Sequence, residues 1–356
     1  MEKILMKGNE AIAEAAITAG CRYFFGYPIT PQTEVAAYMA KRLPKIGGTY
    51  LQAESEIAAI NMVIGAAAAG VRVMTSSSSP GISLKSEGIS YLSGCDLPAV
   101  IVNIQRGGPG LGGIQPSQSD YFQATRGSGH GDYHLIVLAP NNIQEIVNLT
   151  RKAFDLADKY RVGVMILGDG VLGQMMEPVI MDECPKTELP PKDWALTGTK
   201  GTRGKNIVNS LYLDPEELQR RNFERFDKYA EIAKTETLFE KYKTDDADIV
   251  LVAYGAPSRI CKNAINTARA KGIKVGLFRP ITLYPFPKQE LAELALSTRV
   301  FISVEMSMGQ MVDDVRLATE CRRPVSVCAR TGGVIHTPEN ILDAIEKEAA
   351  NFRGVI

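Results

Sequence analysis

The fold of this chain is decided by the stretch Gly26-Tyr27-Pro28-Ile29-Thr30-Pro31. This stretch ends a strand predicted from Tyr23 to Gly26 and leads into a helix predicted from Pro31 to Arg42, because proline is favoured in the first turn of a helix. The proline after Thr30 also restricts the backbone of Thr30, so the threonine hydroxyl is held in one place. That hydroxyl could bind a ligand or cap the helix, and the two roles are compatible.

Two more predicted strands end at a charged residue. The strand from Tyr50 to Ala53 runs into a helix that carries Glu56, and the apolar run from Pro98 to Gln105 stops at Arg106. Parallel strands of an open α/β sheet have their carboxyl ends at one edge, and ligands bind in the crevice along that edge. We therefore expect the Thr30 hydroxyl, one carboxylate and one guanidinium to meet there.

Short strand and helix patterns alternate through the first half of the chain. The further predicted helices are 9–19, 54–69, 83–93 and 143–159, and the further predicted strands are 71–75, 99–104, 135–139 and 162–167. This alternation is typical of a parallel sheet with helices on both faces. The sequence therefore predicts a doubly wound α/β domain over residues 1–178.

The alternation of strands and helices stops at residues 179–245. There a proline-rich and glycine-rich sequence around Trp194 precedes a charged helix predicted from Pro215 to Lys243. So long a segment without strand periodicity is unusual inside a compact domain. We expect an extended arm that wraps a neighbouring subunit, and then a connecting helix. A second, smaller α/β domain is predicted over 246–356, with strands 249–254, 274–278, 300–305 and 325–328 and a helix 258–270.

Length and charge limit the class of protein. The 356 residues exceed the roughly 250–300 that one hydrophobic core supports, so two domains are expected. The 40 basic and 40 acidic side chains balance and form no long run of one sign, which argues against nucleic acid as a partner. No apolar run approaches the ~18 residues that span a bilayer, and the start of the chain does not resemble a signal peptide, so we expect a cytoplasmic protein with no membrane partner.

Metal-binding patterns are absent from the sequence. The 6 cysteines lie far apart with no Cys-x-x-Cys pair, and the chain has 3 histidines. That pattern argues against an iron–sulfur cluster or a structural zinc site, so we predict no metal ligand in this chain. No histidine has a partner at a catalytic spacing, so a serine or cysteine nucleophile has no support. His130 is kept as a candidate donor on a glycine-rich loop.

Five segments, spread over nearly the whole chain, carry a family resemblance. They are Tyr27-Pro-Ile-Thr-Pro31, Gln52-Ala-Glu-Ser-Glu56-Ile-Ala-Ala, Gln105-Arg-Gly-Gly-Pro-Gly110, Arg279-Pro-Ile-Thr-Leu-Tyr-Pro-Phe-Pro287 and Glu305-Met-Ser-Met-Gly-Gln310. On these segments the chain resembles the α subunit of the 2-oxoacid:ferredoxin oxidoreductases. The resemblance makes the first domain the pyrimidine-binding domain for thiamine diphosphate, and the second is similar to the C-terminal domain of transketolases.

The resemblance implies an enzyme that converts a 2-oxoacid and coenzyme A to acyl-CoA, CO2 and reduced ferredoxin. Thr75-Ser-Ser-Ser-Ser-Pro-Gly81 and Gln118-Ser-Asp-Tyr-Phe122 look most like the branched-chain (2-oxoisovalerate, or 3-methyl-2-oxobutanoate) members, while 2-oxoglutarate and pyruvate members share the same skeleton. The chain would act only in a complex with a β subunit, a ferredoxin-like γ or δ subunit, and ferredoxin. A non-catalytic assembly subunit is the alternative.

One motif resembles a magnesium-binding sequence, but we do not predict that it binds magnesium. Leu167-Gly-Asp-Gly170 resembles the start of the family's thiamine diphosphate metal motif, but the asparagine that should follow comes too late, at Asn206. We therefore expect the Mg2+ ion and the diphosphate half of the cofactor on the β subunit. The iron–sulfur clusters are likewise expected on partner subunits.

Glu56 has the most specific implied role. By resemblance it is the carboxylate that hydrogen-bonds a pyrimidine nitrogen of thiamine diphosphate and so promotes loss of the thiazolium C2 proton. The competing interpretation is that Glu56 only occupies the first turn of its helix, where acids are favoured. Glu54 is the competing acid, and it would point to a different side of the helix.

The remaining site residues come from the same resemblance. Arg106 would bind the 2-oxoacid carboxylate, for which a planar guanidinium is suited, although a surface salt bridge is its alternative role. Thr30 would bond that carboxylate or the cofactor adduct. Donors at Ser78 and Ser79, at a strand end before a helix, could hold an anion or close a capping loop. The predicted cofactor-binding residues are Tyr27, Pro28, Ile29, Glu56, Ser78 and Ser79.

Overall fold

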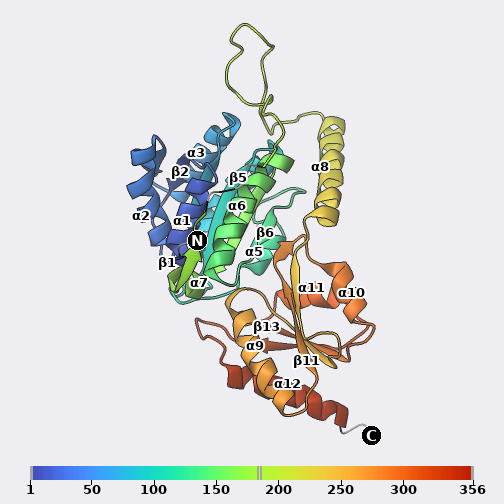
Figure 1. The fold of residues 1–356 in the computed structure, drawn as a ribbon. Helices are drawn as coiled ribbons and strands as arrows, with labels where there is room; N and C mark the ends of the chain where they lie inside the picture. Colours follow the sequence, from blue (N-terminus) through green and yellow to red (C-terminus); the bar gives the residue numbers. More distant parts are fainter. Residues whose placement is uncertain (1–2, 183, 185–186, 354–356) are drawn as a thin grey trace.

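The structure is a computed structural model, and it describes residues 3–182, 184 and 187–353. Residues 1–2, 183, 185–186 and 354–356 belong to the predicted ranges 1–178, 179–245 and 246–356 but lie outside the described residues. Two large sheets covered by helices are joined by a long arm and a helix (Figure 1). No helix in the described ranges is both long and apolar enough to cross a membrane.

Among the described residues, seven strands form the first sheet, in the order β12-β6-β7-β5-β4-β2-β3. They are β2 (Tyr23–Gly26), β3 (Thr49–Gln52), β4 (Val73–Ser77), β5 (Ala99–Gln105), β6 (Ile136–Leu138), β7 (Gly163–Asp169) and β12 (Thr282–Tyr284). Neighbouring strands are parallel except for β12 with β6. The chain enters the sheet at β2, adds β3 on one side and continues with β4 on the other. Open α/β sheets bind ligands at such a reversal of strand order.

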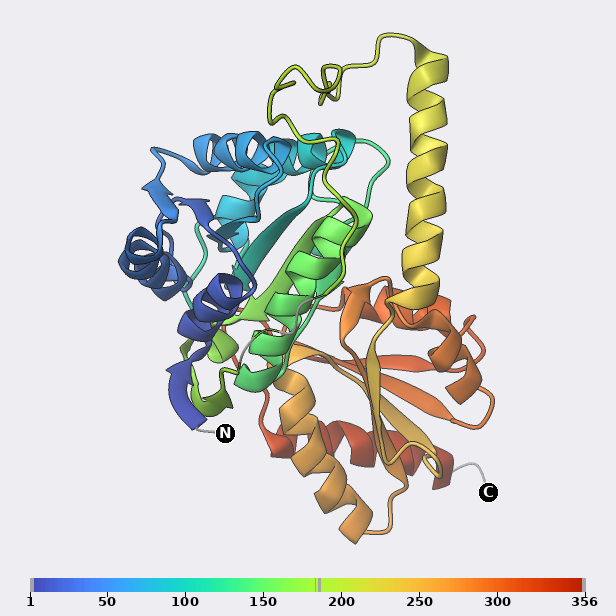
Figure 2. The same cartoon turned by 45° about the horizontal axis from the view of Figure 1, so that its top comes forward.

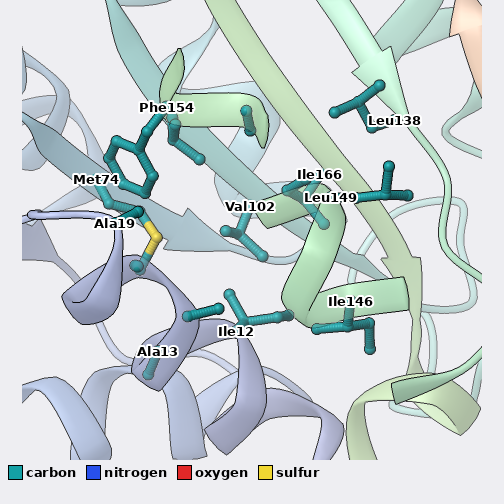
Figure 3. Close-up of a cluster of buried hydrophobic side chains, with 14 of the residues drawn as sticks. Ile12, Ala13, Ala19, Met74, Val102, Leu138, Ile146, Leu149, Phe154 and Ile166 are labelled. Carbon is teal, nitrogen blue, oxygen red and sulfur yellow. The ribbon is translucent and has the colours of Figure 1, made fainter. Parts of the chain in front are cut away.

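Helices cover both faces of this sheet, because successive residues of a strand point to opposite sides. Those on one face are α1 (Gly8–Thr18), α2 (Thr33–Arg42) and α6 (Ile143–Tyr160), and those on the other are α3 (Glu56–Ala68) and α4 (Ser79–Gly94). On β5, Val102 packs in the first cluster and Ile101 in the second. Figure 3 shows the first cluster, in which Val102 belongs to the same group of buried side chains as Ile12 of α1 and Ile146 of α6. Burial on both faces explains why β5 is one continuous apolar run.

Five strands form the second sheet, in the order β14-β13-β10-β11-β9 within the described chain. They are β9 (Phe239–Tyr242), β10 (Ile249–Val252), β11 (Val275–Pro280), β13 (Val300–Glu305) and β14 (Val325–Ala329). One face packs on α9 (Gly255–Ala270) and α12 (Pro338–Arg353), and the other on α10 (Lys288–Leu294) and α11 (Met311–Ala318). Figure 2 shows this unit beneath the first sheet and below α8 (Pro215–Thr235), the long yellow helix.

Two short strands tie the units together across the predicted boundaries. β12 belongs by sequence to the range 246–356, yet it pairs with β6 of the first sheet, with Thr282 opposite Leu138. β9 belongs to the range 179–245, yet it forms the edge of the second sheet. Arg279 of β11 makes ion pairs with Glu145 of α6 at 2.7 Å and with Glu240 of β9 at 2.8 Å. The division of the chain at residues 178 and 245 stays a prediction.

The arm follows a small antiparallel pair, β1 (Lys3–Lys7) with β8 (Met176–Ile180). Its described residues before α8 form neither helix nor strand. Trp194 packs its ring on the guanidinium of Arg161, so part of the arm lies on its own subunit. Farther along, Ile207 is 82% exposed and Leu213 is 87% exposed. This segment forms the long loop at the top of Figure 1.

Several predicted helices have different limits in the structure, among them α4, which begins at Ser79 instead of Ser83. α2 begins at Thr33 instead of Pro31, and Gln32 is the residue that precedes the helix. α8 ends at Thr235 instead of Lys243, because Phe239 to Tyr242 pair with β11. The alternating charges of that stretch resembled a helix surface, and the neighbouring strand overrides the local pattern.

Candidate active site

The carboxyl ends of four neighbouring strands deliver the residues that the sequence singled out. Thr30 follows β2, Ser79 follows β4, Arg106 follows β5 and Glu56 follows β3. Direct contacts join three of them. Arg106 donates from Nη1 to the carbonyl oxygen of Thr30 at 2.9 Å, and its backbone N–H donates to Ser79 Oγ at 3.0 Å. The structure therefore brings the β2, β4 and β5 loops together at the point where the strand order reverses.

Glu56 is the first residue of α3, and it is 6% exposed. Ser55 caps the helix, since its side chain accepts the N–H of Ala58 at 3.2 Å, so Glu56 is not needed as the cap. The Glu56 carboxylate makes no hydrogen bond to any residue that the structure describes. A buried polar group without a partner is costly, so this carboxylate is placed to accept a hydrogen bond from a ligand.

Glu54 lies in a different environment. It precedes the cap residue Ser55, is outside α3 and is exposed. A solvated carboxylate has no need of a ligand donor. Of the two competing acids, Glu56 is the one at a buried site.

Gly81 of α4 lies directly against the Glu56 side chain. A Cβ atom at Gly81 would stand 2.8 Å from Glu56 Oε1 and 2.1 Å from Ser77 Oγ, so glycine avoids a collision there. Ser77 Oγ is buried and has no hydrogen-bond partner within the described ranges. Two polar groups without partners thus adjoin a residue that has no side chain, and this arrangement suits a polar ligand.

Lys85 lies one helical turn beyond Gly81 on α4 and is fully buried. Its Nζ donates to Thr75 Oγ1 at 2.9 Å and to the carbonyl oxygen of Ser76 at 3.0 Å. Burial lowers the pKa of Lys85 to about 8, and the negative charge of Glu56 opposes that decrease. Lys85 was not predicted as a site residue, because one lysine among small and apolar residues has the pattern of a solvent-facing helix position.

Arg106 is 8% exposed and is held by backbone oxygens. Besides the Thr30 carbonyl, the carbonyl of Leu111 accepts a hydrogen bond from Nη2 at 3.2 Å, and Nε is buried without a partner in the described structure. No carboxylate of the described chain forms an ion pair with Arg106, so the surface salt bridge has no support. The uncompensated guanidinium is suited to an anion.

The loop after β2 leaves Thr30 accessible. Thr30 and Pro28 are exposed, while Tyr27 and Ile29 are half-buried. Because Gln32 precedes α2, Thr30 is not the cap of that helix, which removes the alternative role of its hydroxyl. The Thr30 hydroxyl has no partner among the residues described here.

Ser78 and Ser79 use their hydroxyl groups within the protein. Ser78 Oγ donates to the carbonyl oxygen of Ile104 at 2.6 Å, and Ser79 Oγ donates to Asp120 Oδ2 at 2.6 Å. Asn103 also donates to Asp120 at 3.0 Å, and burial raises the pKa of the Asp120 carboxyl. These bonds fasten the end of β4 to the end of β5. The predicted cofactor contacts of the two serines stay a prediction.

A cavity of about 640 Å³ opens where the two α/β units meet beside Ser79. Leu84, Gly108 and Asp120 line it from the first unit, and Met308 from the second. Volumes of this order are typical of sites for small organic ligands. One segment of this region, Gln118 to Phe122, was noted in the sequence, where nothing indicates that Asp120 is buried.

Asp169 and His130 lie outside this group. Asp169 caps α7 (Gly170–Gln174), with Oδ1 accepting the N–H of Val171 at 2.8 Å, and burial raises the pKa of Asp169 to about 6. No cluster of histidine, cysteine, aspartate or glutamate in the described ranges has the arrangement of a metal site. His130 lies 3.3 Å from Ser90 Oγ, which is ~16 Å along α4 from Ser79.

Comparisons with known proteins agree with this geometry. Residues 14–237 match the family described as pyruvate flavodoxin/ferredoxin oxidoreductase, thiamine diphosphate-binding, and residues 247–341 match the pyruvate:ferredoxin oxidoreductase core domain II. The fold and its strand-end site therefore define a thiamine diphosphate-binding α/β protein. More particularly, the chain belongs to the 2-oxoacid:ferredoxin oxidoreductase family, as an α-type subunit.

The relatives cover nearly the whole chain. It is 53% identical to ketoisovalerate oxidoreductase subunit VorB of Methanothermobacter marburgensis, over 97% of each chain. It is 39% identical to 2-oxoglutarate synthase subunit KorA of the same organism, over 97% of this chain and 98% of that one. The predicted family is confirmed.

Solved structures give the same result. The chain superposes with a TM-score of 0.87 and 31% identity on 2-oxoglutarate:ferredoxin oxidoreductase from Magnetococcus marinus, described with 2-oxoglutarate, coenzyme A and succinyl-CoA bound. The match covers 98% of this chain and 65% of that one. A split-gene transketolase, 13% identical with a TM-score of 0.60 over 96% of this chain and 97% of that one, shares the fold. The predicted fold class is confirmed.

Proposed function

We propose that this chain is the α subunit of an oxidoreductase that decarboxylates a branched-chain 2-oxoacid with coenzyme A. The products are acyl-CoA, CO2 and reduced ferredoxin, which takes up the two electrons released. Identities of 53% and 52% to two ketoisovalerate oxidoreductase subunits support this substrate over 2-oxoglutarate or pyruvate. One methylene changes binding by only ~1–3 kcal/mol, so a panel of 2-oxoacids on the reconstituted complex is the test of substrate choice.

The observation that carries the proposal is the buried Glu56 carboxylate, which lacks a donor among the described residues. The aminopyrimidine ring of thiamine diphosphate has a nitrogen that can share a proton with such a carboxylate, and Gly81 and Ser77 leave a polar niche beside it. The residues therefore fit the pyrimidine half of the cofactor. When bound, thiamine diphosphate supplies the nucleophilic carbon that attacks the 2-oxo group.

The proposed role of this chain's own residues is to bind and orient the cofactor and the 2-oxoacid. Glu56 would hold a proton at the pyrimidine nitrogen of the bound cofactor, and the loop Tyr27 to Ile29 would contribute to binding it. Arg106 pairs with the carboxylate of the 2-oxoacid, which its buried and uncompensated charge supports. Thr30 donates its free hydroxyl to the same carboxylate or to the bound adduct. Ser78 and Ser79 remain proposed cofactor-binding residues, and their hydroxyl groups fasten the ends of β4 and β5 beside this site.

Partner subunits complete the proposed enzyme in the cytoplasm. We assign the diphosphate and Mg2+ site to a β subunit and the iron–sulfur clusters to a ferredoxin-like γ or δ subunit. The engagement of the Asp169 carboxylate as a helix cap supports the first assignment. The exposed Ile207 and Leu213 support an arm that lies against a neighbouring subunit.

Exchange of the thiazolium C2 proton for deuterium in the reconstituted complex tests the role of Glu56. Glu56→Gln keeps the size and one oxygen but removes the charge, so exchange should become much slower while cofactor binding changes less. Glu54→Gln is the matched control and should leave exchange unchanged. If Glu54→Gln alone slows exchange, the acid is misassigned. If neither does, the alternative of a non-catalytic assembly subunit gains.

A further inference from the structure

Lys85 is a buried cation that the mechanism above does not use. It is fully buried on α4, and both hydrogen-bond acceptors of its ammonium group, Thr75 Oγ1 and the Ser76 carbonyl, are neutral. A charge in a protein interior needs a compensating charge. The charge that acts on Lys85 belongs to Glu56.

Glu56, on α3, is a buried anion that likewise has no direct ionic partner in the part of the chain that the structure describes. Its carboxylate is also buried, and it makes neither a hydrogen bond nor a salt bridge with the described residues. The two charges therefore compensate each other through space instead of through direct contact. A direct salt bridge would occupy the carboxylate oxygens, whereas a separated pair leaves them open to a ligand.

The groups that face Lys85 come from two other elements. β4 provides Thr75 and Ser76, whose hydroxyl donates to Gln32 at 2.5 Å, and α3 provides Glu56. Glu56 is the charged member of this set. The neutral cage fixes the position of the ammonium group on the same helix that carries Gly81, the residue that touches Glu56.

We propose that Lys85 is a positioning residue of the active site, whose buried charge balances that of the Glu56 carboxylate and leaves its oxygens free for the cofactor pyrimidine. This inference rests on the proposed role of Glu56. Since burial lowers the pKa of Lys85 only to about 8, the side chain is still protonated at neutral pH and can perform this task.

Lys85→Met tests the inference because methionine keeps the apolar stem and removes the charge. The measurement is C2 proton exchange of bound thiamine diphosphate in the complete complex, recorded against pH and together with cofactor affinity. Without the cation, the acid limb of the exchange profile should move upward by ~1–3 pH units, so that exchange at neutral pH falls by roughly tenfold or more and recovers as pH is raised. A loss that is equal at every pH would show structural damage and overturn the proposal.

Thr75→Val is the matched control, because it removes one acceptor of the ammonium group but keeps the charge. Its acid limb should stay where it is in the wild type. A shift as large as that of Lys85→Met would mean that the cage, not the charge, matters, and would refute the inference.

The double variant Glu56→Gln with Lys85→Met separates the two hypotheses. If Lys85 acts through Glu56, Lys85→Met should add no further loss of exchange once Glu56 is glutamine. An added loss in that background would refute the role of Lys85. If Glu56→Gln alone leaves exchange intact, the proposed role of Glu56 fails instead.

Stability supplies a second measurement if Lys85→Met folds poorly. Removing one member of a buried charge pair is destabilising, whereas replacing both members by neutral groups is often tolerated. The unfolding midpoint of the double variant should therefore lie above that of Lys85→Met. Equal midpoints would show that the two charges are not coupled.

Discussion

Gly81→Ala places one methyl group between Ser77 and Glu56. The new Cβ would stand 2.1 Å from Ser77 Oγ and 2.8 Å from Glu56 Oε1. The Ser77 hydroxyl can rotate away, since it has no hydrogen-bond partner in the described structure. The Glu56 oxygen must retreat by roughly 0.5 Å to reach an ordinary carbon–oxygen distance of about 3.3 Å.

Such a displacement should be felt more strongly by the chemistry than by the fold. A misplacement of ~1 Å can cost ~100-fold in rate, so a retreat of half that size predicts C2 proton exchange slower by roughly 10-fold. The free energy of unfolding should fall by only ~0–2 kcal/mol, since overpacking costs ~1–3 kcal/mol and alanine returns ~1 kcal/mol of helix propensity. Denaturant unfolding of the chain and C2 exchange in the complex measure the two effects separately.

Gly88→Ala is the matched control on the same helix. A Cβ there would stand 2.4 Å from Ile60 Cγ2 of α3, so the substitution crowds the same pair of helices at a distance from Glu56. Its stability loss should equal or exceed that of Gly81→Ala while exchange stays normal. Equal slowing by the two variants, or normal exchange in Gly81→Ala, would refute the argument that Gly81 makes room for the Glu56 carboxylate.

Three further outcomes are expected. Arg106→Ala should lower kcat/KM for the 2-oxoacid by roughly 10–100-fold, which corresponds to the loss of a charged hydrogen bond, while the affinity for thiamine diphosphate stays nearly unchanged. Equal losses of affinity for the 2-oxoacid and for the cofactor would contradict the assignment of Arg106 to the substrate carboxylate. Burial raises the pKa of Asp169 from 3.8 to about 6. The protonated Asp169 side chain therefore adds to the free energy of unfolding below pH ~4, and this contribution is lost as the pH rises to ~6. Unfolding free energies of wild type and Asp169→Asn should thus diverge by about 3 kcal/mol across that window, and a constant difference would contradict the assignment. Arg279→Met should lower the free energy of unfolding by about 3 kcal/mol, because Glu145 and Glu240 lose their shared cation. Arg316→Met, at an exposed ion pair, should lower it by under ~1 kcal/mol. Similar losses in denaturant unfolding would show that the Arg279 ion pairs stabilise the protein no more than a surface pair does.

The limits of many elements were visible in the sequence. β2 and β13 have the predicted bounds Tyr23–Gly26 and Val300–Glu305, since apolar residues fill them and loop residues or charges follow. β12 was not predicted, because its three residues have no periodicity and only β6, far away in sequence, gives them a partner. β9 was missed for the same physical reason, with β11 as the partner.

Some residues of the candidate site could likewise be predicted from the sequence, and others could not. Glu56 and Arg106 could be named from sequence because each follows a strand and carries the charge that its implied ligand needs. Lys85 could not, because its burial depends on Thr75, Ser76 and Glu56, which come from two other elements. The helix cap at Ser55 leaves Glu54 outside α3 and makes Glu56 its first residue, and a cap is a matter of backbone geometry that residue spacing alone leaves open.

The pairing of β12 with β6 limits how this protein can be divided or can move. A chain cut at residue 245 would leave β6 with an unpaired edge, and exposed strand edges promote aggregation. The thiamine diphosphate-binding half is therefore unsuited to expression as an isolated piece. Rotation of one half that carried β12 away from β6 would also have to break the backbone hydrogen bonds between these two strands.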